Sequence, residues 1–190
     1  MKLLQSITIM SLGAALLLAT PTNHEEKAIE TGNKASASLL KTLGQNMKAH
    51  IEKGGVMDAL NFCTTQAYPL TQKVNSELPK GVEVKRVSLK SRNPANQATE
   101  DEKEVLQSFD ELTQKNEKLP QYILKDFNSN SYKYYTPLII DKPVCLKCHG
   151  DISNNTQLTK EINETYPQDK AIGYKMNDVR GAIVVTIQHQ

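Results

Sequence analysis

The feature that most constrains this chain is a six-residue run near its C-terminal end, Cys145-Leu-Lys-Cys-His-Gly150. Two cysteines separated by two residues can each form a thioether with a vinyl group of haem, and a histidine directly after the second can reach the iron. If the run forms a helical turn, Cys145 and His149 share a face and Cys148 lies beside them. The motif therefore predicts one covalently attached haem c, with Cys145 and Cys148 as attachment points and His149 as an axial ligand.

Two other chemistries use a pair of cysteines at this spacing. A dithiol redox pair belongs on a thioredoxin-like βαβ unit, and no such pattern surrounds Cys145 and Cys148. A zinc site needs a second Cys or His pair at ligand spacing, which the sequence lacks. The motif thus favours haem over a dithiol, a zinc site or a structural disulfide.

The N-terminal residues are typical of a secretory signal peptide. Lys2 precedes an apolar run that ends near Ala19, and polar residues follow from Pro21 onward. Polar residues interrupt the run, and because a membrane span needs about 20 mostly apolar residues, the run is a poor membrane span. An uncleaved anchor is the alternative interpretation. We expect a signal peptide at 1–21, a polar linker at 22–34 and a domain at 35–190. Export to the periplasm agrees with the haem motif, and no stable membrane span is expected after cleavage.

Hydrophobic periodicity predicts three helices in the first two thirds of the domain, over residues 35–51, 56–78 and 99–115. Gly54 and Gly55 end the first of them, and the first two helices are expected to form an antiparallel pair. Pro69 lies inside the second pattern and predicts a kink or break there, because proline removes an intrahelical hydrogen bond.

Alternating apolar residues predict strands over 82–89, 132–140 and 181–188, with a short strand near 122–124 and a helix near 160–165. Helices followed by strands mixed with further helices are typical of an α+β domain.

A haem held by one histidine has a second axial position. The candidate ligands outside the leader are His24, Met47, His50, Met57, Cys63, Met176 and His189. Cys63 is the odd thiol, on the apolar stripe of the second helix beside Leu60 and Ala67. Two interpretations stay open: an inert buried cysteine, or a thiolate ligand of ferric iron.

A series of motifs along the chain resembles the family of single-haem c-type domains with a PAS-like fold, formerly a domain of unknown function. Its members occur alone in exported proteins or as the sensor part of membrane signalling proteins. In chain order the motifs are Cys63, Gly81–Asn96, Tyr134–Pro137, Cys145–Gly150, Tyr166–Tyr174 and Asp178–Ile183. The resemblance covers nearly all of the chain after the leader.

The resemblance implies a PAS-like fold with a central antiparallel sheet, and a haem iron held by histidine and cysteine. By position these ligands are His149 and Cys63. Arg86 and Arg92 have no role that the resemblance assigns. Arg86 is expected either to meet a haem propionate or, like Arg92, to pair with Asp169 or Asp178 or to meet solvent.

The resulting hypothesis is an exported redox or diatomic-gas sensor that acts through a redox or signalling partner protein. The alternative is a small periplasmic electron-transfer cytochrome. We expect no enzyme, since no distal histidine is positioned as a general acid or base. The formal charge of +2 gives no reason to expect nucleic acid as a partner.

Overall fold

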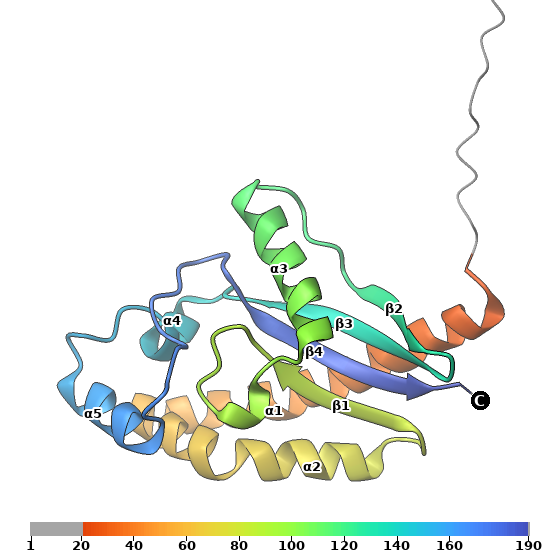
Figure 1. Cartoon of the computed structure of the whole chain (residues 1–190). Coiled ribbons are helices and arrows are strands. Elements are labelled where there is room, and N and C mark those ends of the chain that lie inside the picture. The colour runs from red at the N-terminus through yellow and green to blue at the C-terminus, as the bar shows by residue number, and fades with distance from the viewer. Residues whose placement is uncertain (1–20, 190) are drawn as a thin grey trace, which may run out of the picture.

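Two helices at the N-terminal end form one layer of the protein, which packs against one face of the sheet (Figure 1). The computed structural model describes residues 21–189. Helix α1 spans Asn23–Thr65 and helix α2 spans Ala67–Glu77. Gln66 separates them, and Pro69 lies in the first turn of α2, where its missing N–H leaves no helical bond unmade. The predicted break is therefore present, three residues before the proline.

The backbone of α1 is not helical at Gly54 and Gly55, and the φ of Gly55 is +70°. The rings of His50 and Phe62 stack with centroids 4.8 Å apart. In an unbroken helix, residues twelve apart lie about 18 Å apart along the axis. The chain therefore reverses direction at Gly54–Gly55, and α2 runs back along the first part of α1, as the predicted antiparallel pair requires.

The polar linker expected at residues 22–34 is wrong, because these residues form the start of α1. Thr22 caps the helix: its hydroxyl accepts a hydrogen bond from Glu25 N, and its own N–H donates to the Glu25 carboxylate. Ala28, Gly32 and Ala35 are buried on the inner face. Small side chains of this kind escape a search for large apolar residues. The predicted signal peptide lies almost entirely outside the described residues and stays a prediction.

The sheet has four antiparallel strands in the order β1-β4-β3-β2. They are β1 (Val82–Val87), β2 (Ile123–Asn128), β3 (Ser131–Ile139) and β4 (Val179–Gln188). Helix α3 (Glu100–Gln114) covers the face opposite α1 and α2, while α4 (Pro143–His149) and α5 (Thr156–Thr165) follow β3. A short 3₁₀ helix, Pro94–Asn96, precedes α3. The expected α+β class with an antiparallel sheet and an N-terminal helical pair is confirmed.

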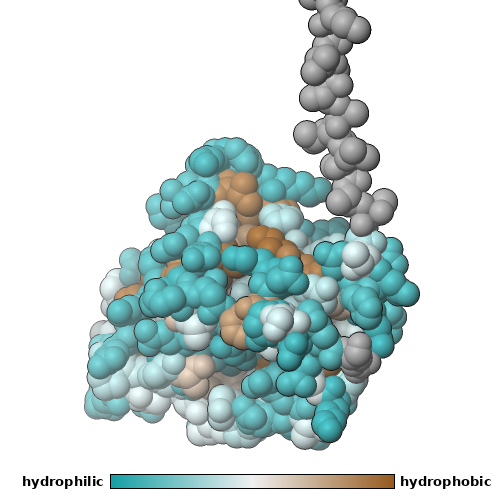
Figure 2. All heavy atoms as spheres, turned by 45° about the vertical axis from the view of Figure 1, so that its right-hand side comes forward, coloured by the Kyte–Doolittle hydropathy of each residue, from teal (hydrophilic) through white to brown (hydrophobic). Residues whose placement is uncertain are grey.

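Both faces of the sheet are buried, and β4 divides its side chains between them. Ile183, Val185 and Ile187 pack with α1 and α2. Ala182 and Val184 pack on the other face with Val105, Leu106 and Phe109 of α3. This is the alternation that the sequence of β4 predicts. The surface seen in Figure 2 is largely hydrophilic, with small separate apolar areas. Within residues 21–189 no helix is both long and apolar enough to cross a membrane.

Two glycines of α1 give a matched test of the packing between α1 and β3. A Cβ added at Gly32 would lie 2.3 Å from Cγ of Tyr134, whereas one added at Gly44 meets no atom within 4 Å. We expect Gly32→Ala to lower the free energy of unfolding by about 1–3 kcal/mol, because overpacking displaces the buried tyrosine. Gly44→Ala should raise it by about 0.5–1 kcal/mol. Chemical denaturation of both variants checks this, and equal effects would contradict the contact.

Candidate haem-binding site

The Cys145–His149 motif forms helix α4, as the sequence predicts. Pro143 occupies its first turn, which suits the fixed φ of proline, and Gly150 ends the helix by donating its N–H to Leu146 O at 2.9 Å. Cys145 packs against a small cluster made by Ile140, Ala171 and Tyr174. Cys148 packs against a different cluster, which includes Leu60 of α1. None of the three cysteines is in a disulfide.

The His149 ring is held in one tautomer. Its Nδ1 lies 2.8 Å from the backbone oxygen of Ala171. A carbonyl only accepts hydrogen bonds, so Nδ1 carries the hydrogen and Nε2 keeps its lone pair. Burial, with smaller contributions from Arg180 and Arg92, lowers the pKa of His149 to about 3. The imidazole is therefore neutral at physiological pH, as a metal ligand must be.

Arg92 fixes the segment that holds His149. Its guanidinium pairs with Asp169 at 3.1 Å and donates to Cys148 O at 2.8 Å and to Ala171 O at 3.3 Å. Both charged side chains are buried, with exposed fractions of 9% and 3%. Of the two expectations for Arg92, the ion pair with Asp169 is the one present. The pair ties the Tyr166–Tyr174 segment to the last turn of α4. From the sequence, this pairing is only one of several options for Arg92.

Cys63 lies near the C-terminal end of α1, and its side chain is exposed while Leu60 and Ala67 are buried. The thiol is therefore not part of the core, which is where the inert-cysteine interpretation placed it; its role as a ligand stays a prediction. Protein around the sulfur raises the pKa of the Cys63 thiol by desolvation, and the cations of Arg86 and Arg92 oppose this rise.

Cys63 also lies near α4. Burial raises the pKa of the Cys148 thiol, Arg92 opposes the rise, and Cys63 adds to it. Cys148 also packs in one cluster with Leu60, one helical turn before Cys63, so the two thiols come from neighbouring segments although 85 residues separate them in the chain (148 − 63 = 85). The fold thus places Cys63, the cysteine outside the haem motif, near helix α4, which carries that motif.

Two buried guanidinium groups have unused hydrogen-bonding capacity beside these residues. Among the described residues, Nε of Arg86 and Nε of Arg180 are buried without a hydrogen-bond partner. Burial lowers the pKa of both side chains, and for Arg86 the nearby Cys63 and Tyr166 oppose this effect. A buried cation of this kind requires an anionic partner. Haem carries two propionates, so two guanidinium groups near a neutral histidine and three thiols fit the prosthetic group.

Three of the other candidate axial ligands are engaged elsewhere. Nδ1 of His50 lies 2.8 Å from the Asp58 carboxylate, and its ring stacks on Phe62. Met47 packs against the core under α1. The ring of His189 lies against Tyr132. In the described part of the chain, no three His, Cys, Asp or Glu side chains gather in a way that could hold a metal ion by themselves.

Comparisons with known proteins agree with this architecture. A family model described as Tll0287-like matches residues 17–188. The crystal structure of the cyanobacterial haem protein Tll0287 superposes with a TM-score of 0.61 at 22% sequence identity, covering 89% of this chain and 99% of that chain. A comparison with curated proteins finds no match. At this identity, the solved structure supports the fold.

Proposed function

The chain belongs to the Tll0287-like family, and from this membership we propose that it is a single-haem c-type cytochrome, exported to the periplasm, that acts as a redox or diatomic-gas sensor. Cys145 and Cys148 would hold the haem through thioethers, and His149 and Cys63 would bind its iron. The observation that carries the proposal is a neutral His149, with its hydrogen on Nδ1, on the same helix as both attachment cysteines, one of which, Cys148, packs beside the turn of α1 that precedes Cys63.

Each side chain of the site has a distinct task. The Ala171 carbonyl and the Arg92–Asp169 pair keep His149 oriented with Nε2 outward. The positive charges of Arg86 and Arg92 favour the thiolate form of Cys63. Arg86 and Arg180 would pair with the haem propionates through their unused Nε hydrogens. When bound, the haem supplies an iron that changes oxidation state and can take a diatomic gas at a free axial position.

A sensor needs a part that moves, and the backbone around Cys63 is suited to movement. Residues 56–65 form a short helical segment between the non-helical Gly54–Gly55 and the break at Gln66. Cys63 lies near the end of this segment. A thiolate favours ferric over ferrous iron, so the Cys63 thiolate would leave a reduced haem more easily than an oxidised one. Its release would let residues 56–65 shift between the two breaks, and a partner protein would read the altered surface.

The test is the addition of carbon monoxide to the reduced protein, followed by its visible spectrum. We expect stoichiometric binding, since Cys63 gives up its position, and no binding to the oxidised protein, which serves as the control. The Cys63→Ala variant should bind carbon monoxide faster than the wild type because nothing has to leave. A reduced protein whose spectrum stays unchanged under carbon monoxide would contradict sensing and would support the electron-transfer alternative, in which both ligands remain bound.

A further inference from the structure

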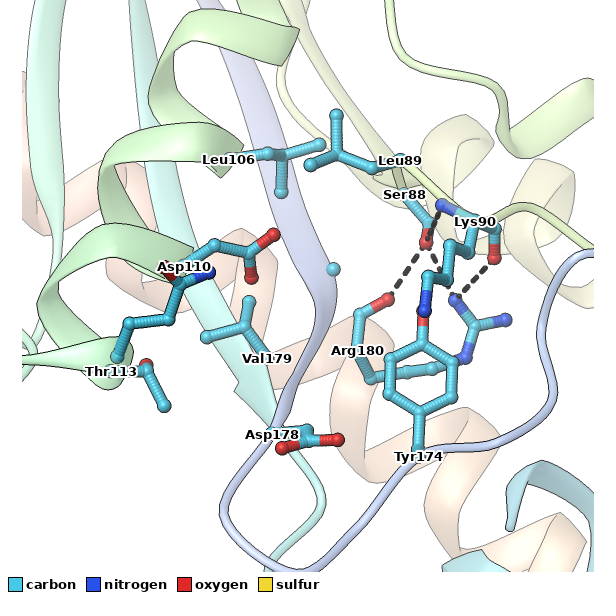
Figure 3. Close-up of a pocket in the computed structure, with 12 residues that line it drawn as sticks. Ser88, Leu89, Lys90, Leu106, Asp110, Thr113, Tyr174, Asp178, Val179 and Arg180 are labelled. Carbon is cyan, nitrogen blue, oxygen red and sulfur yellow. Dashed lines mark hydrogen bonds between the residues drawn. The ribbon is translucent and has the colours of Figure 1, made fainter. Parts of the chain in front are cut away.

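A pocket of about 270 Å³ lies between α3, the ends of β1 and β4, and Tyr174 (Figure 3). The haem-site residues Cys63, Cys145, Cys148 and His149 do not line it, whereas Arg180, whose Nε belongs to the candidate haem site, does, so the pocket adjoins that site. Its volume is below the roughly 300–1,000 Å³ that is typical of sites for drug-sized ligands. The pocket therefore suits a small metabolite.

One wall of the pocket carries a carboxylate that has no hydrogen-bonded or ion-paired side chain among the described residues. Asp110 extends from α3 toward the pocket, and Asp178 lies near its lower edge (Figure 3). Asp178 accepts a hydrogen bond from Lys175 N at 2.7 Å. The Asp110 carboxylate makes no hydrogen bond or ion pair with another side chain of the described region. Burial and the neighbouring Asp178 raise the pKa of Asp110, while Lys90 opposes the rise. A ligand with a cationic group would pair with the carboxylates of this wall.

The opposite wall is cationic. The Lys90 ammonium lies over the Tyr174 ring, 5.3 Å from its centroid, and forms no ion pair with the residues described. The Arg180 guanidinium also lies 5.3 Å from the Tyr174 centroid, and its Nη1 donates to Ser88 Oγ at 2.7 Å and to Lys90 O at 3.2 Å. Those bonds fix the Arg180 guanidinium in the wall of the pocket. The exposed Lys90 ammonium is then the cation available to bind the carboxylate of a ligand.

Between the two charged walls lie apolar side chains. Leu89, Leu106 and Val179 line the pocket (Figure 3). A simple anion would be repelled by the two carboxylates, and a simple amine would be repelled by Lys90 and Arg180. A molecule that carries one charge of each sign and a short apolar part meets all three surfaces.

We propose that this pocket binds a small zwitterion of the α-amino acid class. The ammonium group lies toward Asp110 and Asp178, the carboxylate toward Lys90, and the side chain against Leu89, Leu106 and Val179. Tyr174, which forms one wall, also meets His149 edge-on with ring centroids 6.3 Å apart, and its N–H donates to His149 O. The pocket is therefore next to the segment that holds the candidate iron ligand, and it shares Arg180 with the candidate haem site, whereas the groups proposed to bind the zwitterion, Asp110 and Lys90, belong to the pocket alone.

Calorimetric titration of the haem-loaded protein with L-leucine tests the proposal. Two probes resemble leucine but each lacks one of its charges: 4-methylpentanoate has no ammonium group, and isoamylamine has no carboxylate. We expect leucine to bind with a stoichiometry of one and each analogue to bind at least about tenfold more weakly. An analogue that binds as tightly as leucine would overturn the zwitterion. Absence of binding by leucine and by every other common L-amino acid would overturn the site.

Variants locate the binding to this pocket. Asp110→Asn and Lys90→Met should each weaken leucine binding by about tenfold or more, because each removes one charged partner. Glu111→Gln and Lys115→Met change neighbouring exposed charges that do not line the pocket, so leucine binding should be unchanged. Wild-type affinity in Asp110→Asn, or equal weakening by the control variants, would overturn the proposed placement.

Discussion

A variant in which Cys145 and Cys148 are both alanine is expected to lose all covalently attached haem. Thioether formation consumes these two sulfurs, and no other cysteine lies on α4. The measurement is haem staining of the denatured protein, made in cells that mature c-type cytochromes. The wild type should stain, and the double variant should not.

The matched control for this result is Cys63→Ala. It also removes a thiol, but from α1, so it should keep the stain at wild-type intensity. Loss of the stain in Cys63→Ala with retention in the double variant would contradict the assignment of the attachment cysteines. Retained folding of the double variant is expected, because Cys145 and Cys148 pack only at the edges of two small clusters.

The second large effect is expected for Cys63→Ser. A thiolate donates charge to ferric iron and stabilises it, whereas a serine hydroxyl is a much poorer ligand. The ferric visible spectrum should change, and the midpoint potential should rise by on the order of 0.1 V or more, since axial ligands set haem potentials over a range of roughly 0.8 V. Spectroelectrochemistry measures both.

Thr65→Ser is the control for this substitution. It changes a side chain two residues further along the same turn of α1, whose hydroxyl bonds only to Asn61 O. The potential of this variant should match that of the wild type. If Cys63→Ser leaves both the ferric spectrum and the potential unchanged, the thiol of Cys63 is not a ligand.

Local patterns were sufficient for most elements of the fold. The alternation in β4 identifies both of its faces, and Thr99 with the acidic first turn predicts the start of α3. The first turns of α1 were missed because their buried side chains are small. Strand order was beyond local reasoning: β1 pairs with β4, almost a hundred residues away, and periodicity within a strand carries no information on its neighbours.

The candidate site likewise has one part that local sequence patterns predict and another part that they do not. The motif on α4 is contiguous, so spacing alone leads to the prediction of haem attachment there, which stays a prediction. The Arg92–Asp169 pair and the hydrogen bond from His149 to Ala171 join segments that are distant in the sequence, and the spacing of residues does not choose among such partners. For Cys63, the position on a helical stripe suggested a buried side chain. The turn of α1 that carries Cys63 instead leaves the thiol at the surface near α4.

X-ray absorption at the iron edge of the ferric wild-type protein tests the central claim most directly. A haem held between His149 and Cys63 gives iron a first shell of five nitrogens and one sulfur: four from the porphyrin, one from imidazole and one from the thiolate. We predict that single sulfur. A first shell of nitrogen alone, or a purified protein without iron, would contradict the account.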